Sequence, residues 1–210
     1  MAEKKPLKRR QRADGELSRT RILDAATEIA AERGYEGTSI GAVSAKCGLP
    51  ASSIYWHFKD KDDLIAAVIE RSFTHWLSVW QLPDDLVGRD RLMEIAAGTA
   101  KAFLDSPDYL RLGLMLALER RPIEPRARAM FIQVRDQALD ALIRSIPDIV
   151  PGLTEEQARR LATYAIAGAD GLFIAKEIGG DSVDLVDLFA VHGQALYDTA
   201  LRMLEENESR

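Results

Sequence analysis

The sequence predicts an all-α protein, with an N-terminal three-helix helix-turn-helix head followed by a C-terminal helical bundle. Three observations carry this expectation. Apolar residues recur at three- and four-residue spacing along most of the 210 residues, and no alternating apolar and polar run is long enough to predict a strand. Proline and glycine residues separate the helical stretches. Two short helices near the N-terminus are separated only by a tight turn.

Composition excludes several other classes of protein. The chain is 47% apolar and 29% charged, which is typical of globular domains and excludes disorder for most of its length. No apolar run approaches the ~18 residues of a membrane span, and no apolar stretch follows the N-terminal charges as it would in a secretory signal. The single cysteine, Cys47, allows no internal disulfide and no cysteine-based zinc site by itself, so we expect a cytoplasmic protein.

The first helix is expected to begin after a disordered basic arm, residues 1–15, which is charged and lacks periodicity. Ser18 is expected to cap this helix, with Leu17 packing onto Ile22. Gly34 is expected to end the helix in a left-handed turn. The apolar stripe of this helix consists of Ile22, Leu23, Ala26, Ile29 and Ala30.

The second and third helices form the predicted helix-turn-helix. Thr38 is expected to cap the second helix, and Gly48 supplies the positive φ that a sharp turn between helices needs. Pro50 suits the first turn of a third helix that runs over about residues 50–58. In a helix-turn-helix the second helix of the pair enters the major groove of DNA, so this third helix is the candidate recognition helix.

The residue types of the third helix fit a DNA-facing role. Ile54 and Phe58 are four residues apart and are expected to face the core, which leaves the other sides to Ala51, Ser52, Ser53, Tyr55, Trp56 and His57. Small residues at 51–53 let a backbone approach base edges, and serine hydroxyls donate or accept there. Lys59, Lys61 and the hydroxyl of Thr38 are placed to meet phosphates.

Charge supports this assignment. Residues 1–61 hold 12 Lys and Arg against 8 Asp and Glu, a net charge of +4, whereas residues 62–210 hold 16 against 25, a net charge of −9. A basic head on an acidic protein indicates an anionic partner, with nucleic acid first among candidates. A solvated basic tail is the ordinary alternative.

A fourth helix, capped by Asp60 and covering about residues 62–81, is expected to join the head to the rest of the chain. Further helices are expected over about 88–105, 107–121, 125–146, 154–179 and 182–206, with a capping box at residues 154–157. The predicted division is a DNA-binding domain at 16–61 and a ligand-binding and dimerisation domain at 62–210.

Four segments together resemble the DNA-binding domain of the TetR family of bacterial transcriptional regulators: TRILDAA from Thr20, ERGYEGTSI from Glu32, CGL from Cys47 and IYWHFKDKDDL from Ile54. The resemblance covers about residues 18–64, and beyond them only an all-helical architecture of suitable length. It implies DNA contacts at Thr38, Tyr55, His57 and Lys61, with residues 51–53 and Trp56 deciding sequence. The full candidate set is Thr38, Ser39, Ala51, Ser52, Ser53, Tyr55, Trp56, His57, Lys59 and Lys61.

The C-terminal aromatic and methionine side chains have two interpretations, a bundle core or a small-molecule pocket between helices. The resemblance to TetR-like proteins implies such a pocket and a largely apolar effector. The candidate lining is Trp76, Trp80, Phe103, Tyr109, Leu114, Met115, Leu118, Phe131, Tyr164 and Phe173.

The last two long helices are expected to form a homodimer interface, because small residues at 161–175 permit close approach between helices and the final helix carries an apolar stripe. An intrachain core is the alternative. The candidate interface is Ala165, Ala169, Leu172, Leu188, Phe189, His192 and Leu196.

These observations predict a dimeric regulator that binds a palindromic DNA operator and is released from it by a small molecule. An activator of the same fold and a helical ligand-binding protein that does not bind DNA remain the alternatives. The sequence holds no recognisable catalytic constellation, phosphate loop or dinucleotide fingerprint, and no metal-ligand spacing. We therefore expect neither an enzyme nor a resident cofactor or metal.

Overall fold

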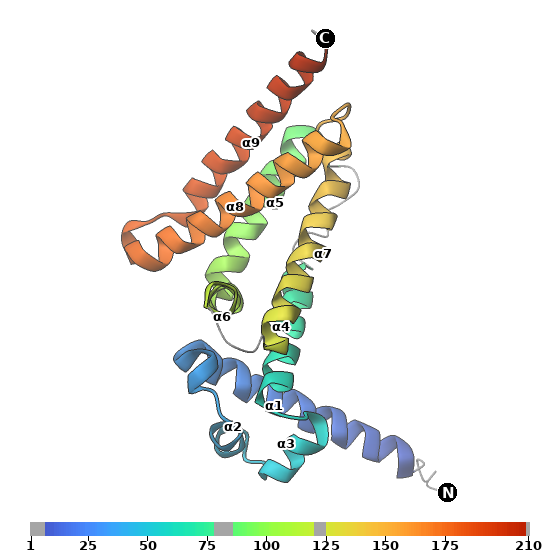
Figure 1. Ribbon diagram of the computed structural model, residues 1–210, viewed down its shortest axis with the longest axis vertical. Helices are drawn as coiled ribbons and strands as arrows, with labels where there is room; N and C mark the ends of the chain where they lie inside the picture. The colour runs from blue at the N-terminus through green and yellow to red at the C-terminus, as the bar shows by residue number, and fades with distance from the viewer. Residues whose placement is uncertain (1–6, 78–85, 120–124, 209–210) are drawn as a thin grey trace, which may run out of the picture. The chain divides into compact units, whose positions relative to one another are not determined.

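The computed structural model of the chain describes residues 7–77, 86–119 and 125–208, and every regular element in these ranges is helical (Figure 1). The chain divides into two compact units, the first formed by Met1–Phe73 with Asp108–Ile132 and the second by Thr74–Pro107 with Gln133–Arg210. Among the described residues no helix is long and apolar enough to cross a membrane.

The first unit begins with three helices and the start of a fourth. They are α1 (Leu7–Gly37), α2 (Ile40–Cys47), α3 (Ala51–His57) and α4 (Lys61–Leu77). Helix α6 (Pro107–Leu118) and the first turns of α7 (Arg126–Ile149) complete this unit. The predicted apolar stripe of α1 is buried, and it forms the core of this unit with Leu64 and Val68 of α4 and with Val43, Ile54 and Phe58.

Helix α1 starts earlier than the sequence predicts. Its backbone is helical from Leu7, so residues 7–15 are not the disordered arm that we expected, and residues 1–6 lie outside the described residues. Ser18 does not cap a helix, because its hydroxyl donates to the carbonyl oxygen of Asp14, 2.9 Å away, as a serine inside a helix does. Leu17 is 65% exposed and packs no staple.

Two glycines behave as the sequence predicts. Gly34 has φ 67° and interrupts the helical backbone inside α1. Gly48 has φ 68° and caps α2, with its amide donating to the carbonyl oxygen of Ser44. Only glycine adopts these conformations without strain, so both breaks are local consequences of the sequence. Pro50 stands one residue before α3 rather than inside its first turn.

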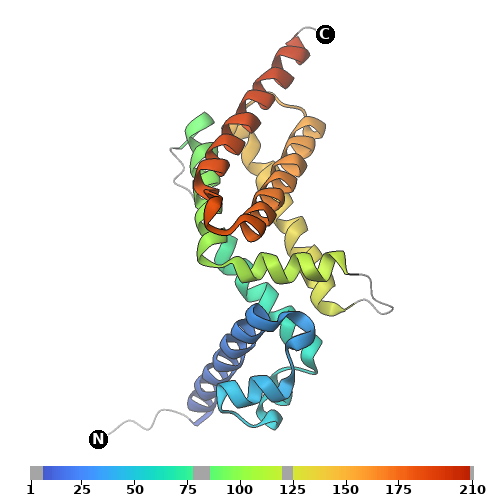
Figure 2. The ribbon, with the colours of Figure 1, turned by 90° about the vertical axis from the view of Figure 1, so that its left-hand side faces the viewer.

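The second unit packs four long helices. It contains α5 (Gly88–Asp105), the rest of α7, α8 (Glu155–Gly179) and α9 (Leu185–Glu208), with a short 3-10 helix, η2 (Gly180–Ser182), after α8. Helix α9 packs against both α5 and α8, and Figure 2 shows α8 and α9 side by side. The predicted capping box at Thr154 and Gln157 is confirmed, whereas α7 continues past the predicted stop, with Pro147 inside its last turn.

Candidate nucleic-acid interface

Two side-chain hydrogen bonds fix the turn between α2 and α3. The hydroxyl of Ser44 donates to the carbonyl oxygen of Leu49, 2.7 Å away, across the turn. The guanidinium of Arg21, on α1, donates to the carbonyl oxygen of Cys47 at 2.6 Å. Because the turn is held by α1 as well as by its own residues, the angle between α2 and α3 is set by the core of the unit.

Helix α3 has one buried and one exposed side. Ile54 is fully buried and Phe58, which follows the helix, is 3% exposed, so both anchor the helix in the core as predicted. Tyr55 and Trp56 are 55% and 74% exposed. Large aromatic side chains with that much exposure on a seven-residue helix are unusual for a surface without a partner.

The remaining candidate residues of α3 extend the same exposed side. Ser52 is exposed, and Ala51, Ser53 and His57 are half-buried. We call Ser52, Ser53, Tyr55, Trp56 and His57 the outer face of α3. It combines hydroxyl groups with aromatic rings on the helix that the helix-turn-helix presents.

Ser39, rather than the predicted Thr38, caps α2. Ser39 is the N-cap of α2, and its hydroxyl oxygen accepts from the amide of Ala42 at 3.1 Å. Thr38 is only 1% exposed, and its hydroxyl donates to the carbonyl oxygen of Gly34. The prediction that Thr38 caps the helix is therefore wrong, and its hydroxyl already makes a hydrogen bond inside the protein.

His57 packs against Trp56, and its surroundings lower its pKa. Its imidazole meets Trp56 edge to face, with ring centroids 4.5 Å apart. Partial burial lowers the pKa of His57, and the positive charge of Arg19 lowers that pKa further. A neutral imidazole both donates and accepts hydrogen bonds, so His57 suits contact with a base edge or a sugar better than a salt bridge to phosphate.

The two candidate lysines differ in their surroundings. Lys59 is exposed at the end of α3, and its backbone amide donates to the carboxylate of Asp63 at 3.0 Å. The ammonium of Lys61 donates to the carbonyl oxygen of Tyr35 at 3.2 Å and lies 4.2 Å from the centre of the Tyr35 ring. Lys61 thus supports the fold around Tyr35, a role that its position in the sequence did not indicate.

Residues 22–68 match the family described as bacterial regulatory proteins, tetR family. The helix-turn-helix segment of the chain is thus of the TetR-family type. An HTH-type transcriptional repressor of Mycobacterium tuberculosis is 26% identical over 138 residues, which are 66% of this chain and 51% of that protein. The HTH-type transcriptional regulator AcrR of Shigella flexneri is 30% identical over 122 residues, 58% of this chain and 50% of that protein. The chain therefore spans about half the length of these relatives.

Solved structures share the TetR-like fold. A transcriptional regulator from Rhodococcus sp. RHA1 has a TM-score of 0.72 at 18% identity, over 88% of this chain and 96% of that one. FadR from Bacillus subtilis, solved in complex with stearoyl-CoA, has a TM-score of 0.67 at 19% identity, over 85% of this chain and 97% of that one. These likenesses confirm the predicted all-helical architecture.

The aromatic residues predicted to line a pocket form two separate clusters, one in each unit. In the second unit Phe103 packs against Trp76, Phe173 and Phe189, with ring centroids 5.4 to 6.3 Å apart. In the first unit Tyr109 packs against Phe73 and Phe131 at 6.2 and 6.1 Å. These rings fill core space in each unit, which matches the ordinary interpretation of the aromatic stripes.

Some other predicted lining residues are exposed. Met115, Leu118 and Tyr164 are 50%, 76% and 58% exposed, so their side chains are open to solvent in the single chain, and their assignment to a pocket lining stays a prediction. Leu114 is half-buried, and Trp80 lies outside the described residues. The apolar positions of these helices can be predicted from the sequence, but the side of each helix that meets the core cannot.

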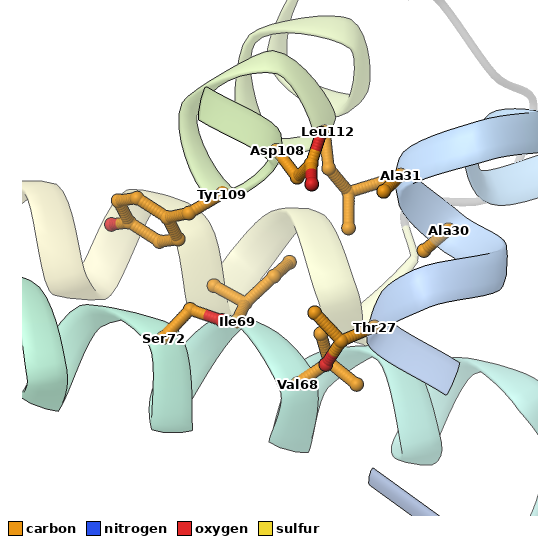
Figure 3. Close-up of a pocket in the computed structure, with 9 residues that line it drawn as sticks. All are labelled: Thr27, Ala30, Ala31, Val68, Ile69, Ser72, Asp108, Tyr109 and Leu112. Atoms are coloured by element: carbon orange, nitrogen blue, oxygen red, sulfur yellow. The ribbon is translucent and has the colours of Figure 1, made fainter. Parts of the chain in front are cut away.

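Each unit contains a hollow that the sequence did not reveal. In the first unit, α1, α4 and α6 surround about 230 Å³ of space not filled by atoms, part of it open to solvent. Figure 3 shows its lining, with Thr27, Ala30 and Ala31 from α1, three residues from α4, and Asp108, Tyr109 and Leu112 from α6. Tyr109 belongs to the predicted pocket set, and the small side chains of Ala30 and Ala31 leave the space.

The hollow of the second unit is entirely apolar. It comprises about 330 Å³ of unfilled space, also partly open, between α5, α7, α8 and α9. Leucine, isoleucine, valine and alanine side chains line it, and none comes from the predicted pocket set. Leu142, Ile146, Ile149 and Leu161 are typical of this lining. Nothing in the sequence distinguishes these positions from an ordinary core stripe.

Several predicted interface residues face the core of their own unit. Phe189 and Leu196 are 2% and 5% exposed, so their assignment to a dimer interface is wrong. The His192 ring nitrogen Nε2 lies 3.0 Å from the carbonyl oxygen of Ala165, and the ring sits against Gly168, where a Cβ atom would overlap it. Part of the small-residue stretch of α8 thus serves the approach of α8 to α9 within one chain. The other candidates, Ala169, Leu172 and Leu188, are half-buried.

A different stripe of α8 faces outward. Tyr164, Ala167, Gly171, Ile174 and Ile178 are all exposed and follow one another at intervals of three and four residues. Val186 and Val191 add exposed apolar area on α9. We call the five positions on α8 the outer stripe. Such spacing places them on one side of the helix.

Among the described residues, no group of three His, Cys, Asp or Glu side chains is arranged to hold a metal ion. Cys47 is buried in the turn after α2, where its thiol lies 3.7 Å from the carbonyl oxygen of Ser44.

Proposed function

We propose that this chain is a sequence-specific DNA-binding transcriptional regulator, and a repressor in the absence of its effector. The observation that carries this is the outer face of α3, where exposed aromatic rings and serine hydroxyls stand on a helix anchored by Ile54. The match of residues 22–68 to the tetR family, and the similarity to a transcriptional repressor and a transcriptional regulator, support the proposal.

In this proposal α3 enters the major groove of double-stranded DNA. Ser52 and Ser53 read base edges, and Tyr55 and Trp56 fill the groove wall and contact the sugar–phosphate backbone. Ser39 and Lys59 meet phosphates on either side of α3, and Ala51 lets the backbone come close. We assign residues 16–61 to DNA binding and residues 62–210 to effector binding and dimerisation, with the basic segment 1–15 as a further contact to DNA.

One recognition helix makes few base contacts, so we propose a homodimer that reads a palindrome. The outer stripe of α8, with Val186 and Val191 of α9, is the proposed interface, because it is exposed, apolar and rich in small residues. Ala169, Leu172 and Leu188, which are half-buried, remain further candidates for the interface. Two such helix pairs can form a four-helix bundle.

We further propose that a largely apolar small molecule releases the protein from DNA. The apolar hollow of the second unit supports an apolar effector, and the related fold of FadR was solved with stearoyl-CoA. The effector acts by favouring a conformation with lower DNA affinity. An activator of the same fold would bind DNA in the same way, and the cytoplasm is the setting that either one requires.

The first test is selection of duplexes from a random-sequence DNA library by the purified full-length chain, followed by affinity measurements between about 50 and 200 mM salt. We expect a palindromic site with strongly salt-dependent affinity. Lys59→Ala should weaken binding and reduce the salt slope by about one, whereas Lys101→Ala on the exposed side of α5 should change neither. Failure to enrich any site would contradict the proposal and favour the helical ligand-binding alternative.

The effector part is tested on the selected duplex with stearoyl-CoA and stearate as probes. Release by either probe supports an apolar effector. If neither probe changes the affinity at concentrations where it binds the protein, the effector proposal fails while the DNA-binding proposal stands.

A further inference from the structure

The first turn of α7 is capped by a residue from another helix. A helix leaves its first amides without partners inside the helix, and a side chain just before it usually accepts them. Pro125 precedes α7 and has no side-chain acceptor, and the first turn of α7 holds no acidic residue. The carboxylate of Asp62 on α4 accepts instead, with Oδ1 3.1 Å from the amide of Ala127 and Oδ2 bonded to the amide of Arg126.

The same carboxylate reaches toward the DNA-facing side of the unit. The hydroxyl of Tyr35 donates to Oδ1 of Asp62 at 3.1 Å. Tyr35 in turn holds Lys61, whose ammonium lies against the Tyr35 ring and donates to its carbonyl oxygen. Asp62 therefore connects the first turn of α7 to the residues that hold Lys61.

The neighbouring carboxylate reinforces this connection. One oxygen of Asp63 accepts from the backbone amide of Lys59, and the other lies 2.8 Å from the guanidinium of Arg126. Asp62 and Asp63 thus bind the end of α3 and the start of α4 to the first turn of α7, all within the first unit. Each carboxylate also places negative charge beside the positive end of α7, which stabilises both partners.

We propose that Asp62 is a positioning residue for DNA binding, which connects Lys61, through Tyr35, to the first turn of α7. This inference rests on the proposed function. If α7 withdraws from Asp62, the amides of Arg126 and Ala127 lose their acceptor and Tyr35 loses its anchor. DNA binding and capping of α7 therefore strengthen each other, as thermodynamic linkage requires.

Charge alone predicts that removal of the Asp62 carboxylate strengthens DNA binding, whereas the positioning role predicts that it weakens binding. An affinity measurement therefore separates the two explanations. Removing a carboxylate from a DNA-binding unit reduces repulsion of phosphate and should strengthen binding. We expect Asp62→Asn to weaken binding to the selected duplex by at least about fivefold, the lower end of ordinary coupling between sites. Glu32→Gln, at an exposed position of α1, is the matched control and should bind equally or more tightly.

A second variant tests the hydrogen bond between Tyr35 and Asp62 alone. Tyr35→Phe removes the hydroxyl that Asp62 accepts but keeps the ring beside Lys61. We expect a smaller loss of affinity in the same direction, and the loss in the double variant should be less than the product of the two single losses. A loss of affinity in the double variant equal to the product of the two single losses would show that Tyr35 and Asp62 act independently, and would overturn this link.

Amide hydrogen exchange of the full-length chain gives a readout independent of affinity. Exchange at Arg126 and Ala127 should be faster in Asp62→Asn than in the wild type, and DNA should slow it in the wild type. If the wild type binds DNA but Asp62→Asn binds as tightly, or if DNA leaves exchange at these amides unchanged, the positioning role is overturned. Absence of DNA binding by the wild type would instead overturn the proposed function.

Discussion

The hydroxyl of Thr38 donates a hydrogen bond to the carbonyl oxygen of Gly34, 2.8 Å away, while the hydroxyl of the next residue, Ser39, caps α2 at the surface. The two neighbouring hydroxyl groups therefore have different functions. Thr38 holds the connection between α1 and α2, whereas Ser39 is exposed to solvent.

Substitution should separate these functions. Thr38→Ala removes a buried hydrogen bond and should lower the free energy of unfolding by about 1–3 kcal/mol, with DNA affinity unchanged where the protein is fully folded. Ser39→Ala should lower the free energy of unfolding by about 1 kcal/mol through loss of the cap, and should also weaken DNA binding. Urea denaturation and duplex titration measure the two effects. Equal loss of DNA affinity in folded Thr38→Ala would refute the assignment.

The capping of α2 by Ser39 rather than Thr38 illustrates what the sequence could and could not determine. Gly34 and Gly48 were predictable because positive φ is a local requirement, and Ile54 and Phe58 were predictable because their spacing is periodic. Either adjacent hydroxyl could cap α2, and only the conformation of the preceding connection decides between them.

Helices α8 and α9 of the second unit show a further limit on what can be predicted from the sequence. Helices α8 and α9 each carry apolar residues on more than one side, so the sequence does not decide which side packs within the chain. Phe189 and Leu196 turned out to be core residues, and the outer stripe went unnoticed because small residues broke its apolar pattern. Hollows depend on how side chains of different helices meet, which no single stretch of sequence encodes.

Close packing of α6 against α7 in the first unit depends on Gly113. A Cβ atom at this position would overlap the ring of Phe131, which is buried. We expect Gly113→Ala to lower the free energy of unfolding by about 1–3 kcal/mol through overpacking. The control is Gly41→Ala on the exposed side of α2, where nothing but the Ser39 hydroxyl lies within 4.0 Å of the added atom. It should be neutral or stabilising by up to about 1 kcal/mol in the same urea denaturation.

The pKa of His57 should respond to Arg19. Burial lowers this pKa first and the Arg19 charge second, so Arg19→Gln should raise the pKa without returning it fully to its ordinary value. Because the folded pKa lies below the unfolded one, the unfolded chain binds the proton more readily between the two values. The contribution of His57 to stability is therefore lost as the pH falls from the unfolded pKa to the folded one. An NMR titration of the imidazole, assigned with His57→Asn, measures the shift, and a lower or unchanged pKa in Arg19→Gln would contradict the assignment.

Phosphate near His57 should raise its pKa, which is the opposite of the effect of Arg19. A bound duplex adds negative charge beside the imidazole and should raise its pKa, so lowering the pH through this range should strengthen DNA binding in the wild type more than in His57→Asn. Equal pH dependence of the two proteins would place His57 away from the phosphates.

The ion pair of Arg135 and Asp170 joins α7 and α8 in the second unit through two hydrogen bonds, one of them 2.9 Å long. Burial raises the pKa of Asp170, and Arg135 opposes that rise. Arg135→Gln should lower the free energy of unfolding at pH 7 by about 1–3 kcal/mol, because the carboxylate keeps its charge without its charged partner.

That loss should become smaller as the pH is lowered. Without Arg135 the folded pKa of Asp170 rises further above the unfolded one, so the folded state binds the proton more readily and stability falls as the pH rises through that interval. The difference between wild type and Arg135→Gln should therefore be smaller at about pH 5 than at pH 7. Adding Asp170→Asn should abolish this pH dependence, and a difference that stays constant with pH would show that the carboxylate does not titrate there.

The outer stripe of α8 predicts that one charge can separate the subunits without unfolding them. Ile178 is 83% exposed in the single chain, so Ile178→Glu should leave the free energy of unfolding of the monomer nearly unchanged, while a charge buried at a subunit interface is costly. Analytical ultracentrifugation should detect a shift toward monomer at micromolar concentration. The control is Leu104→Glu, which places the same charge at an exposed apolar position of α5. It should leave the mass of the particle in solution unchanged. If both variants remain dimeric, the interface lies elsewhere, and loss of DNA affinity in Ile178→Glu alone would link dimerisation to operator binding.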